Sequence, residues 1–329
     1  MSKEIKIGLI GAGWMGKAHT TAFHNARMIF GDDMPVFELV SDVSEDAVAK
    51  FAKNMGYNRY TTNWMDVVTD PEIDLVDVAT PNCMHYEMAK AALEHGKHVF
   101  CEKPLSLSAE QSRELADLAK EKGVVNYCGF SNIMNPANQY VAELVKSGKL
   151  GKIMRVHATY DQDMLLDPSI PIAWRHINKL AGSGALGDLC SHLLSVSQMI
   201  MGDMSEVLGV QSIVIPERPV KAGSTEMGKV ENDDLITFLV KYENGAIGDF
   251  SSSRVATGRK NYFYYEIQGT EGSVVYDLEL CARFRSTSRL MPTRTTAVTA
   301  ASAPYCSTRS TRASSTSSRQ AASRSHSTI

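Results

Sequence analysis

This 329-residue sequence has few cysteines, and none are paired at a spacing that holds a metal or a disulfide framework. Its six cysteines lie far apart and form no C-x-x-C pair, which excludes the common zinc-finger spacings and argues against a disulfide scaffold. No stretch approaches the ~20 apolar residues that span a bilayer, and the start is too short in apolar residues for a signal peptide. We therefore expect a soluble protein in a reducing, cytoplasmic setting, with no metal site.

The chain also lacks a net charge large enough to attract nucleic acid or a membrane. It carries 34 Lys and Arg against 37 Asp and Glu, a formal net charge of -3, which leaves no electrostatic footprint for either partner. Hydrophobic residues make up 43%, close to the average of soluble globular proteins. At roughly 100–200 residues per domain, the length suggests two domains.

The end of the chain differs in composition from the rest. Residues 281–329 contain 8 Arg, 12 Ser and 9 Thr but no Lys, Gly, Asp or Glu, and they lack the apolar period of a strand or helix. Such a segment cannot bury enough apolar surface to offset the entropy of ordering it. We predict a low-complexity tail outside the fold, disordered or non-native, and a reading-frame shift near codon 280 would produce it. A genuine basic tail that binds an acidic partner is the alternative.

Residues 1–128 alternate strand patterns with helix patterns. Helical patterns run from the first glycines to about Asn25, over Met84–Glu94 and over Ala109–Lys120. The strand patterns are Ile5–Ile10, Phe37–Val40, Asp74–Ala79, Lys97–Cys101 and Val124–Cys128. Apolar strands joined by helices are typical of a parallel sheet covered on both faces. We therefore predict an N-terminal domain of the α/β class, built on a doubly wound parallel sheet.

Residues 129–280 change to a strand-rich pattern. Helices are predicted at Asn135–Ser147 and Leu186–Met201. The strand patterns are Ile153–Tyr160, Glu206–Ile215, Leu235–Tyr242, Ala246–Ser253, Tyr262–Gln268 and Ser273–Tyr276. Asn244-Gly245 stands between two of them and is a strong hairpin signal. Strands joined by hairpins predict a C-terminal α+β domain with a large, mostly antiparallel sheet.

A glycine-rich turn follows the first strand. Gly11, Gly13 and Gly16 match G-x-G-x-x-G at the passage from strand to helix. The first glycine permits a tight turn, the second lets backbone approach a pyrophosphate, and the third lets helix and strand pack closely. Asp42 ends the second strand and could bind a ribose hydroxyl. Its distance from Gly16 exceeds the usual ~20 residues, which we assign to a loop at Phe30–Pro35. A purely structural glycine turn is the alternative.

Two more loops follow strands at the same edge of the predicted sheet, where ligands bind in open α/β folds. Thr80-Pro81-Asn82 comes first, with His85 one turn later, and could contact the cofactor or form only a proline turn with a helix cap. Glu102-Lys103-Pro104 comes second. Its proline restricts the backbone, so that Lys103 could bind a substrate hydroxyl and favour its deprotonation, or be a solvated lysine.

A carboxylate and an imidazole are spaced to share one helix face in the second half. Asp188 and His192 are four residues apart and suit a general base with a polar companion. A capping Asp beside a structural His is the alternative. No second His stands at ligand spacing, which argues against a metal. Trp174-Arg175 precedes this helix and could stack on or bind a polar ligand, or be buried structurally.

Together these motifs resemble the family of glucose–fructose oxidoreductase, inositol dehydrogenase and rhizopine-catabolism oxidoreductase (Gfo/Idh/MocA). The resemblance covers about residues 1–280 in order, including Gly184-Ala185-Leu186-Gly187-Asp188-Leu189-Cys190-Ser191-His192. It implies a Rossmann domain, an open-faced sheet often used for oligomerisation, and NAD(P)-dependent oxidation of a sugar or polyol hydroxyl. Many relatives continue D-x-x-x-H-x-x-D, whereas Ser195 stands at the last position here. Relatives also continue with ordered strands where the low-complexity tail begins.

The resemblance assigns roles residue by residue. Lys103 would assist the reacting hydroxyl, His192 would be the acid/base, and Asp188 would line the site. The substrate-binding set would be Asp161, Asp163, Trp174, Arg175, Asp188 and His192. The cofactor-binding set would be Gly11, Gly13, Trp14, Met15, Gly16, Asp42, Thr80, Pro81, Asn82, His85, Glu102 and Lys103.

We therefore interpret the chain as an NAD-dependent dehydrogenase of a cyclic polyol or sugar, such as an inositol, a glycoside or an anhydrosugar. NAD is expected over NADP, because Asp42 would repel a 2′-phosphate and Val43–Val48 has no Arg or Lys to neutralise one; Arg59 is the nearby residue that could do so. A keto-sugar reductase or an inactive nucleotide-binding regulator is the alternative. The expected partners are a neutral small-molecule substrate and copies of the chain, as a dimer or tetramer through the second sheet.

Overall fold

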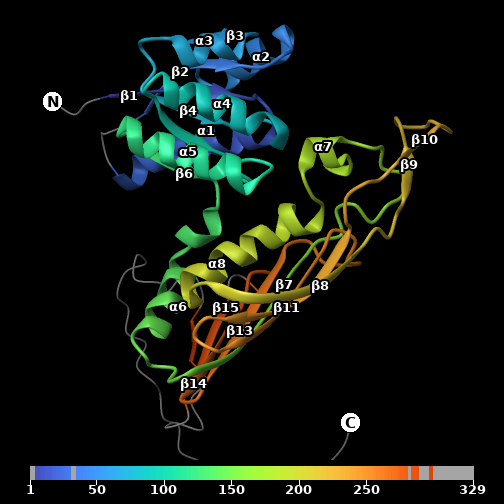
Figure 1. Ribbon diagram of the computed structural model, residues 1–329. Coiled ribbons are helices and arrows are strands. Elements are labelled where there is room, and N and C mark those ends of the chain that lie inside the picture. The colour runs from blue at the N-terminus through green and yellow to red at the C-terminus, as the bar shows by residue number, and fades with distance from the viewer. Residues whose placement is uncertain (1–3, 31–34, 281–282, 289–295, 299–329) are drawn as a thin grey trace, which may run out of the picture.

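The computed structural model describes residues 4–30, 35–280, 283–288 and 296–298. These residues form two parts stacked end to end, the first built on a small sheet and the second on a larger one (Figure 1). None of the helices in the described ranges is long and apolar enough to cross a membrane.

The first part is a six-stranded parallel sheet in the order β3-β2-β1-β4-β5-β6. Its strands are β1 (Ile5–Ile10), β2 (Pro35–Ser41), β3 (Arg59–Thr61), β4 (Leu75–Val78), β5 (His98–Cys101) and β6 (Asn126–Cys128). Its helices are α1 (Trp14–Phe30), α2 (Glu45–Met55), α3 (Trp64–Thr69), α4 (Asn82–Glu94) and α5 (Ala109–Lys122). The strand order reverses between β1 and β4, and ligands bind beside such a switch point. The predicted Rossmann fold is confirmed.

Two features of this sheet differ from the sequence prediction. Helix α1 runs to Phe30 instead of ending near Asn25, so a longer helix accounts for part of the extra spacing before Asp42. The loop predicted at Phe30–Pro35 lies at residues 31–34, outside the described residues. Strand β3 was not predicted, because three residues at an edge are too few to show an alternating pattern.

The second part is an eight-stranded mixed sheet in the order β16-β15-β14-β13-β7-β12-β11-β8. Its strands are β7 (Ile153–Asp161), β8 (Met204–Ser212), β11 (Leu235–Tyr242), β12 (Ile247–Ser253), β13 (Tyr262–Gly269), β14 (Gly272–Asp277), β15 (Arg283–Ser288) and β16 (Thr296–Val298). Only β7 and β12 pair in parallel; the other neighbours are antiparallel. The predicted hairpin joins β11 to β12, and Gly245 adopts the positive φ of 83° that such a turn requires.

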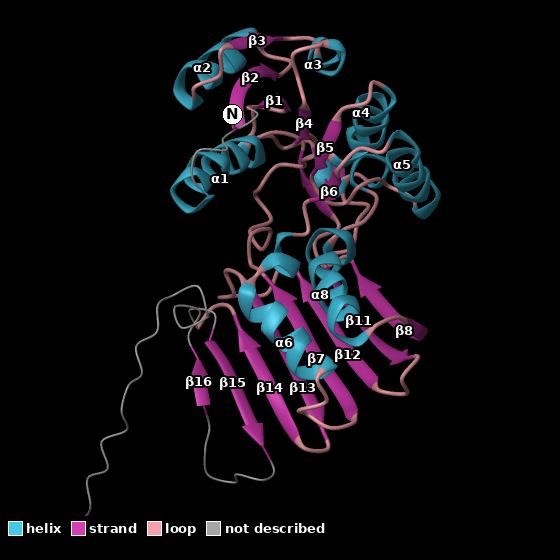
Figure 2. Cartoon of the chain, turned by 90° about the vertical axis from the view of Figure 1, so that its left-hand side faces the viewer, coloured by secondary structure: helices cyan, strands magenta, loops and turns pink. Residues whose placement is uncertain are grey.

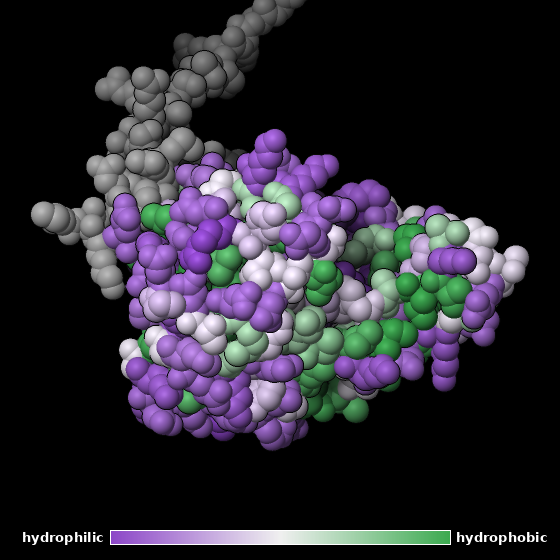
Figure 3. Space-filling model, turned by 90° about the horizontal axis from the view of Figure 1, so that it is seen from above, coloured by the Kyte–Doolittle hydropathy of each residue, from purple (hydrophilic) through white to green (hydrophobic). Residues whose placement is uncertain are grey.

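Helices cover one face of this sheet (Figure 2), and on the opposite, open face alternate residues of β11 are exposed. The covering helices are α6 (Pro136–Lys146) and α8 (Ser191–Met201). The remaining short elements are η1 (Ser131–Met134), η2 (Trp174–His176), α7 (Asn178–Ala181), the π-helical turn η3 (Leu186–Cys190), β9 (Glu217–Pro219) and β10 (Met227–Lys229). Viewed from the first part, most of the visible surface is hydrophilic, and hydrophobic side chains gather toward the side where β9 and β10 project (Figure 3).

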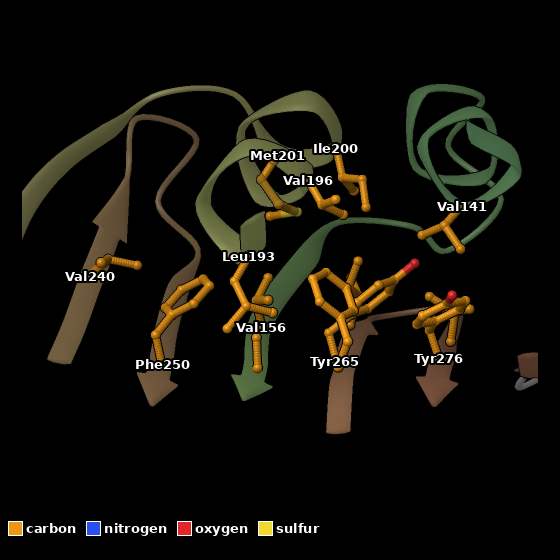
Figure 4. Packing of buried hydrophobic residues seen from close by; sticks show 14 of the residues in the cluster. Val141, Val156, Leu193, Val196, Ile200, Met201, Val240, Phe250, Tyr265 and Tyr276 are labelled. Atoms are coloured by element: carbon orange, nitrogen blue, oxygen red, sulfur yellow. The ribbon is translucent and has the colours of Figure 1, made fainter. Parts of the chain in front are cut away.

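The core of the second part fills the space between these helices and the sheet. Leu193 and Val196 of α8 point toward Val156, Phe250 and Tyr265 of the strands (Figure 4), and all five are buried. Burying one such side chain contributes roughly 1.5–3 kcal/mol, so this layer fixes α8 rigidly on the sheet. Helix α8, which carries the predicted base His192, is therefore firmly packed on the sheet.

The end of the sheet also differs from the prediction that no strand follows Leu280. Strand β15 pairs with β14, and the short β16 pairs with β15. The physical reason is that the outer edge of β14 presents backbone N–H and C=O groups, and pairing with them does not depend on an apolar pattern. The rest of the predicted tail lies outside the described residues.

Candidate active site

The glycine turn leaves backbone accessible where the first helix begins. A Cβ at Gly11 would lie 2.5 Å from the Ala79 oxygen, and one at Gly16 would lie 2.2 Å from the Gly11 oxygen. Gly13 has nothing within 4 Å of that position. The first and third glycines thus permit close packing, while the second leaves open space beside the N-terminus of α1. This arrangement fits a dinucleotide pyrophosphate.

Asp42 is fixed next to that turn. Its carboxylate accepts a hydrogen bond of 2.8 Å from the Ala12 N–H, which places the charge beside the expected ribose position. Arg59 is engaged elsewhere: its guanidinium donates to Glu38 at 2.8 Å and Asp70 at 2.7 Å. These two contacts hold Arg59 away from Asp42. It is therefore not positioned to bind a 2′-phosphate there.

The two predicted loops at the sheet edge are tied together by His85. Its ring nitrogens lie 2.8 Å from the Thr80 oxygen and 2.7 Å from the Pro104 oxygen, and the residue is buried. His85 therefore holds the loops in place instead of facing a ligand. Asn82 donates to the Ala181 oxygen at 3.0 Å and so links this edge to the second part.

Lys103 and Asp188 meet across the junction between the two parts. The Lys103 ammonium donates to the Asp188 backbone oxygen at 2.6 Å and to its carboxylate at 2.9 Å. Burial raises the pKa of Asp188, but the Lys103 and Arg175 charges outweigh this and hold it below its usual range. The Arg175 guanidinium lies 3.7 Å from the same carboxylate and 4.3 Å from the centre of the Trp174 ring.

His192 stands beside this pair in a neutral state. Burial and the nearby Lys103 charge lower its pKa to about 4. Its ring packs edge-on against Phe130 and Tyr160, with centroids 5.8 and 6.0 Å away. Its buried Nδ1 has no hydrogen-bond partner among the described residues. Ser195 donates to the His192 backbone oxygen at 2.9 Å, so its hydroxyl is used within the helix.

The backbone before His192 departs from a regular α-helix. Leu186–Cys190 forms a π-helical turn, in which the Ser191 N–H donates to the Leu186 oxygen. The sequence predicted one continuous helix over Leu186–Met201, so this turn was missed. Such single π turns occur mostly at functional sites, because they re-aim side chains within a helix.

A polar segment that sequence reasoning missed supports the turn. The Asp233 carboxylate accepts hydrogen bonds from Gly184 at 2.7 Å and Leu186 at 2.9 Å. A Cβ at Gly184 would lie 1.8 Å from the backbone oxygen of Asp233, so only glycine fits there. The fully buried Arg254 donates to that same oxygen at 2.9 Å. The run Asn232-Asp233-Asp234, directly before an alternating strand, was the available signal.

Two predicted substrate residues are not brought to His192. Tyr160 faces the helices, so its neighbour Asp161 points to the opposite, open face of the sheet, where its carboxylate accepts from Thr159 at 2.9 Å. The carboxylate of Asp163 is held by Lys260 at 2.6 Å. Within the described ranges, no group of three or more His, Cys, Asp or Glu side chains could hold a metal ion.

Glu102 belongs to a buried cluster with two residues absent from the sequence prediction. One ring nitrogen of His19 lies 3.0 Å from the Asp77 carboxylate, and the other lies 3.1 Å from Glu102. Trp14, by contrast, is largely exposed, and Met15 is half-buried. An acidic residue within the otherwise apolar strand β4 (Leu75–Val78) was the signal that could have revealed Asp77.

Comparison with known proteins finds a matching protein family for each of the two parts. A family described as an oxidoreductase family with an NAD-binding Rossmann fold matches residues 5–130, and the GFO/IDH/MocA C-terminal domain matches residues 138–275. The chain is 37% identical over 290 residues to levoglucosan dehydrogenase of Pseudarthrobacter phenanthrenivorans, covering 84% of this chain and 74% of that protein. It is 27% identical over 280 residues to myo-inositol 2-dehydrogenase of Thermotoga maritima, covering 83% and 75%.

Solved structures agree with these relatives. Levoglucosan dehydrogenase in complex with NADH matches with a TM-score of 0.85 at 36% identity, covering 90% of this chain and 80% of that chain. The same enzyme in complex with NADH and levoglucosan matches with a TM-score of 0.86 at 35% identity, covering 92% and 82%.

Proposed function

The chain belongs to the Gfo/Idh/MocA family of NAD-dependent oxidoreductases, and from that premise we propose that it oxidises a secondary hydroxyl of a cyclic polyol or sugar. NAD is its cofactor. We assign cofactor binding to residues 1–128 and substrate binding to residues 129–280. The observation that carries this proposal is the Lys103–Asp188 pair beside the neutral His192, at the sheet edge that also bears the glycine turn.

NAD would be held by the glycine turn, Asp42 and the Thr80–Asn82 loop, and when bound it supplies the acceptor for a hydride. His192 acts as the general base, since its low pKa leaves a ring nitrogen free to take the hydroxyl proton. The carbon loses its hydrogen as hydride, the oxygen loses its proton to His192, and a C=O bond forms.

Lys103 stabilises the negative charge that develops on the substrate oxygen as the proton leaves. Asp188 accepts from the Lys103 ammonium at 2.9 Å and so fixes its direction. Reduction of a keto-sugar is the same chemistry in reverse, with His192 then returning the proton.

The charges of the site favour a neutral substrate. Lys103 and Arg175 are its cations, and Asp188 lies within 3.7 Å of both. A phosphate would need uncompensated cations or a bidentate arginine to bind its charge. Hydroxyl groups suit the exposed ends of Asp188, Arg175 and Trp174, and levoglucosan and inositols, the compounds named for the relatives, are hydroxyl-rich rings.

The test is NADH formation by the purified protein on a panel of free polyols and sugars, including levoglucosan, myo-inositol and scyllo-inositol. The matching sugar phosphates serve as the control set. Activity on at least one neutral ring is the expected result. Activity on phosphorylated sugars alone would refute the proposal.

We also propose that a second copy of the chain covers the open face of the large sheet. Leu208 and Leu239 are paired neighbours there and are 75% and 57% exposed, and the next pair on that face is the ion pair Glu206–Lys241. Exposed apolar residues bordered by charges are typical of protein interfaces.

A further inference from the structure

A buried cation lies beneath the loop that carries Lys103. His19 is on the second turn of α1, and its ring is enclosed by Asp77 of β4 and by Glu102 at the end of β5. All three side chains are almost completely buried. The ring also packs against Phe100, with centroids 4.7 Å apart.

The partners of His19 determine its protonation state. Nδ1 lies 3.0 and 3.1 Å from the two Asp77 oxygens, and Nε2 lies 3.1 Å from a Glu102 oxygen. An ionised carboxylate only accepts hydrogen bonds, so with both partners ionised both ring nitrogens carry a proton. Burial lowers the pKa of His19, but the two carboxylates outweigh it and raise this pKa to about 10.

The cluster joins the three segments that meet at the cofactor edge. His19 follows the glycine turn on its helix, Asp77 precedes the Thr80 loop on its strand, and Glu102 begins the loop of Lys103. The second Glu102 oxygen accepts from the Lys103 N–H at 3.2 Å. A Cβ at Gly129 would lie 2.5 Å from the first Glu102 oxygen, so Glu102 has little space to adopt another position.

We propose that His19 is a positioning residue of the active site: as a permanent imidazolium bound by Asp77 and Glu102, it fixes the three cofactor-facing segments and the backbone of Lys103. This inference rests on the proposed function for the role of Lys103. The hydrogen bonds themselves exist without substrate, so they can be tested separately from the reaction.

Two weakly acidic side chains beside Asp77 stay neutral, while the Lys103 ammonium next to Glu102 points to Asp188. The Tyr57 phenol and the Cys101 thiol lie near Asp77, and burial raises the pKa of both above their usual ranges. Asp77 and Glu102 are the described residues whose charges raise the pKa of His19. Burial also raises the pKa of Asp77, and the hydrogen bond from His19 opposes that rise, so the ionised state of each group depends on the other. Removing one of the two carboxylates changes the proton affinity of His19 without a second ionisable group taking over.

The first test follows the imidazole of His19 by nitrogen NMR in the substrate-free protein, with the signal assigned by its loss in His19→Gln. The expected result is that both ring nitrogens stay protonated from neutral pH to about pH 9, against an ordinary His pKa of ~6.5. A His19 ring that is neutral at pH 8 would overturn the proposal whatever the substrate proves to be.

The second test uses Asp77→Asn, which preserves shape and removes one carboxylate. The pKa of His19 should fall, so that kcat declines with rising pH well before it does in the wild type. The NAD dissociation constant, measured without substrate, should rise over the same pH range. A variant whose two pH profiles overlay those of the wild type contradicts the proposal.

His19→Gln should lower kcat/KM by roughly 10- to 100-fold, as expected from misplacement of a group near the reacting atoms. It also leaves two buried carboxylates with no cation between them, so the double variant His19→Gln/Asp77→Asn should be more thermostable than His19→Gln alone. His24→Gln, on the exposed side of the same helix, is the matched control and should behave as the wild type. The proposal would be refuted if His19→Gln kept the wild-type kcat/KM and the double variant were no more thermostable than His19→Gln.

Discussion

Two imidazoles of this site have opposite protonation states for the same initial reason. Burial lowers the pKa of both His19 and His192, because a low-dielectric surrounding disfavours a charge. Two carboxylates reverse the effect at His19, whereas the Lys103 ammonium adds to it at His192. The chain thus holds one His as a fixed cation and the other as a neutral proton acceptor.

His192→Ala should lower kcat by about 10²–10⁴-fold, the usual contribution of a general acid or base. NAD affinity should stay close to that of the wild type, because this residue lies on the second part. Steady-state kinetics and a NAD titration measure the two quantities, with His95→Ala at an exposed helix end as the control. Wild-type turnover in His192→Ala would mean that the shared helix face is structural.

Lys103→Ala should lower turnover and also change its pH dependence. His192 works as a base only when it is neutral, so activity rises with pH through its pKa of about 4. Lys103 depresses that pKa, so its removal raises the pKa and moves the acid limb of the kcat profile to higher pH. An acid limb that stays in place, or moves to lower pH, would count against contact between these residues.

Asp42→Asn should weaken NAD binding and narrow the preference over NADP. Hydrogen bonds to a charged group contribute roughly 1.5–3 kcal/mol, so the KM for NAD should rise by about 10- to 100-fold. The Asn oxygen can still accept from the Ala12 N–H, which preserves the turn. Asp46→Asn on the adjoining helix is the control, and equal or tighter binding of NADPH by the wild type would refute the assignment.

At the scale of elements, the order of strands and helices along the chain explains which parts of the site could be predicted from the sequence. The glycine turn and the loops of Thr80 and Lys103 each follow a strand, so strand–helix alternation alone places them at one edge. Asp233 could not be placed this way, because it acts on Gly184 from 49 residues away. The alternation of strand residues places Asp161 on the face opposite Tyr160 and so away from His192.

Asp233→Ala should destabilise the protein and distort the π-helical turn. It leaves the N–H groups of Gly184 and Leu186 without their acceptors in a buried place, and an unsatisfied buried donor costs about 1–3 kcal/mol. Thermal unfolding should show a lower Tm together with reduced kcat. The exposed Asp203→Ala is the control, and an unchanged Tm in Asp233→Ala would contradict the support assigned to it.

At the scale of the whole molecule, the open sheet face is where we propose that a second copy binds. Leu239→Lys places a charge in the exposed apolar group on this face, so it should shift the protein toward monomers. Light scattering coupled to size-exclusion chromatography measures the mass, with Glu243→Lys, at the exposed hairpin end, as the control. A wild type that is monomeric at micromolar concentration would refute the proposed contact between copies.

The contact between Lys103 and Asp188 also constrains how such proteins can diversify. Each part contributes one member of the pair, so neither part holds a complete set of reacting groups by itself. A chimera that joins this cofactor part to the substrate part of a relative would change specificity only where residues equivalent to 103 and 188 still meet.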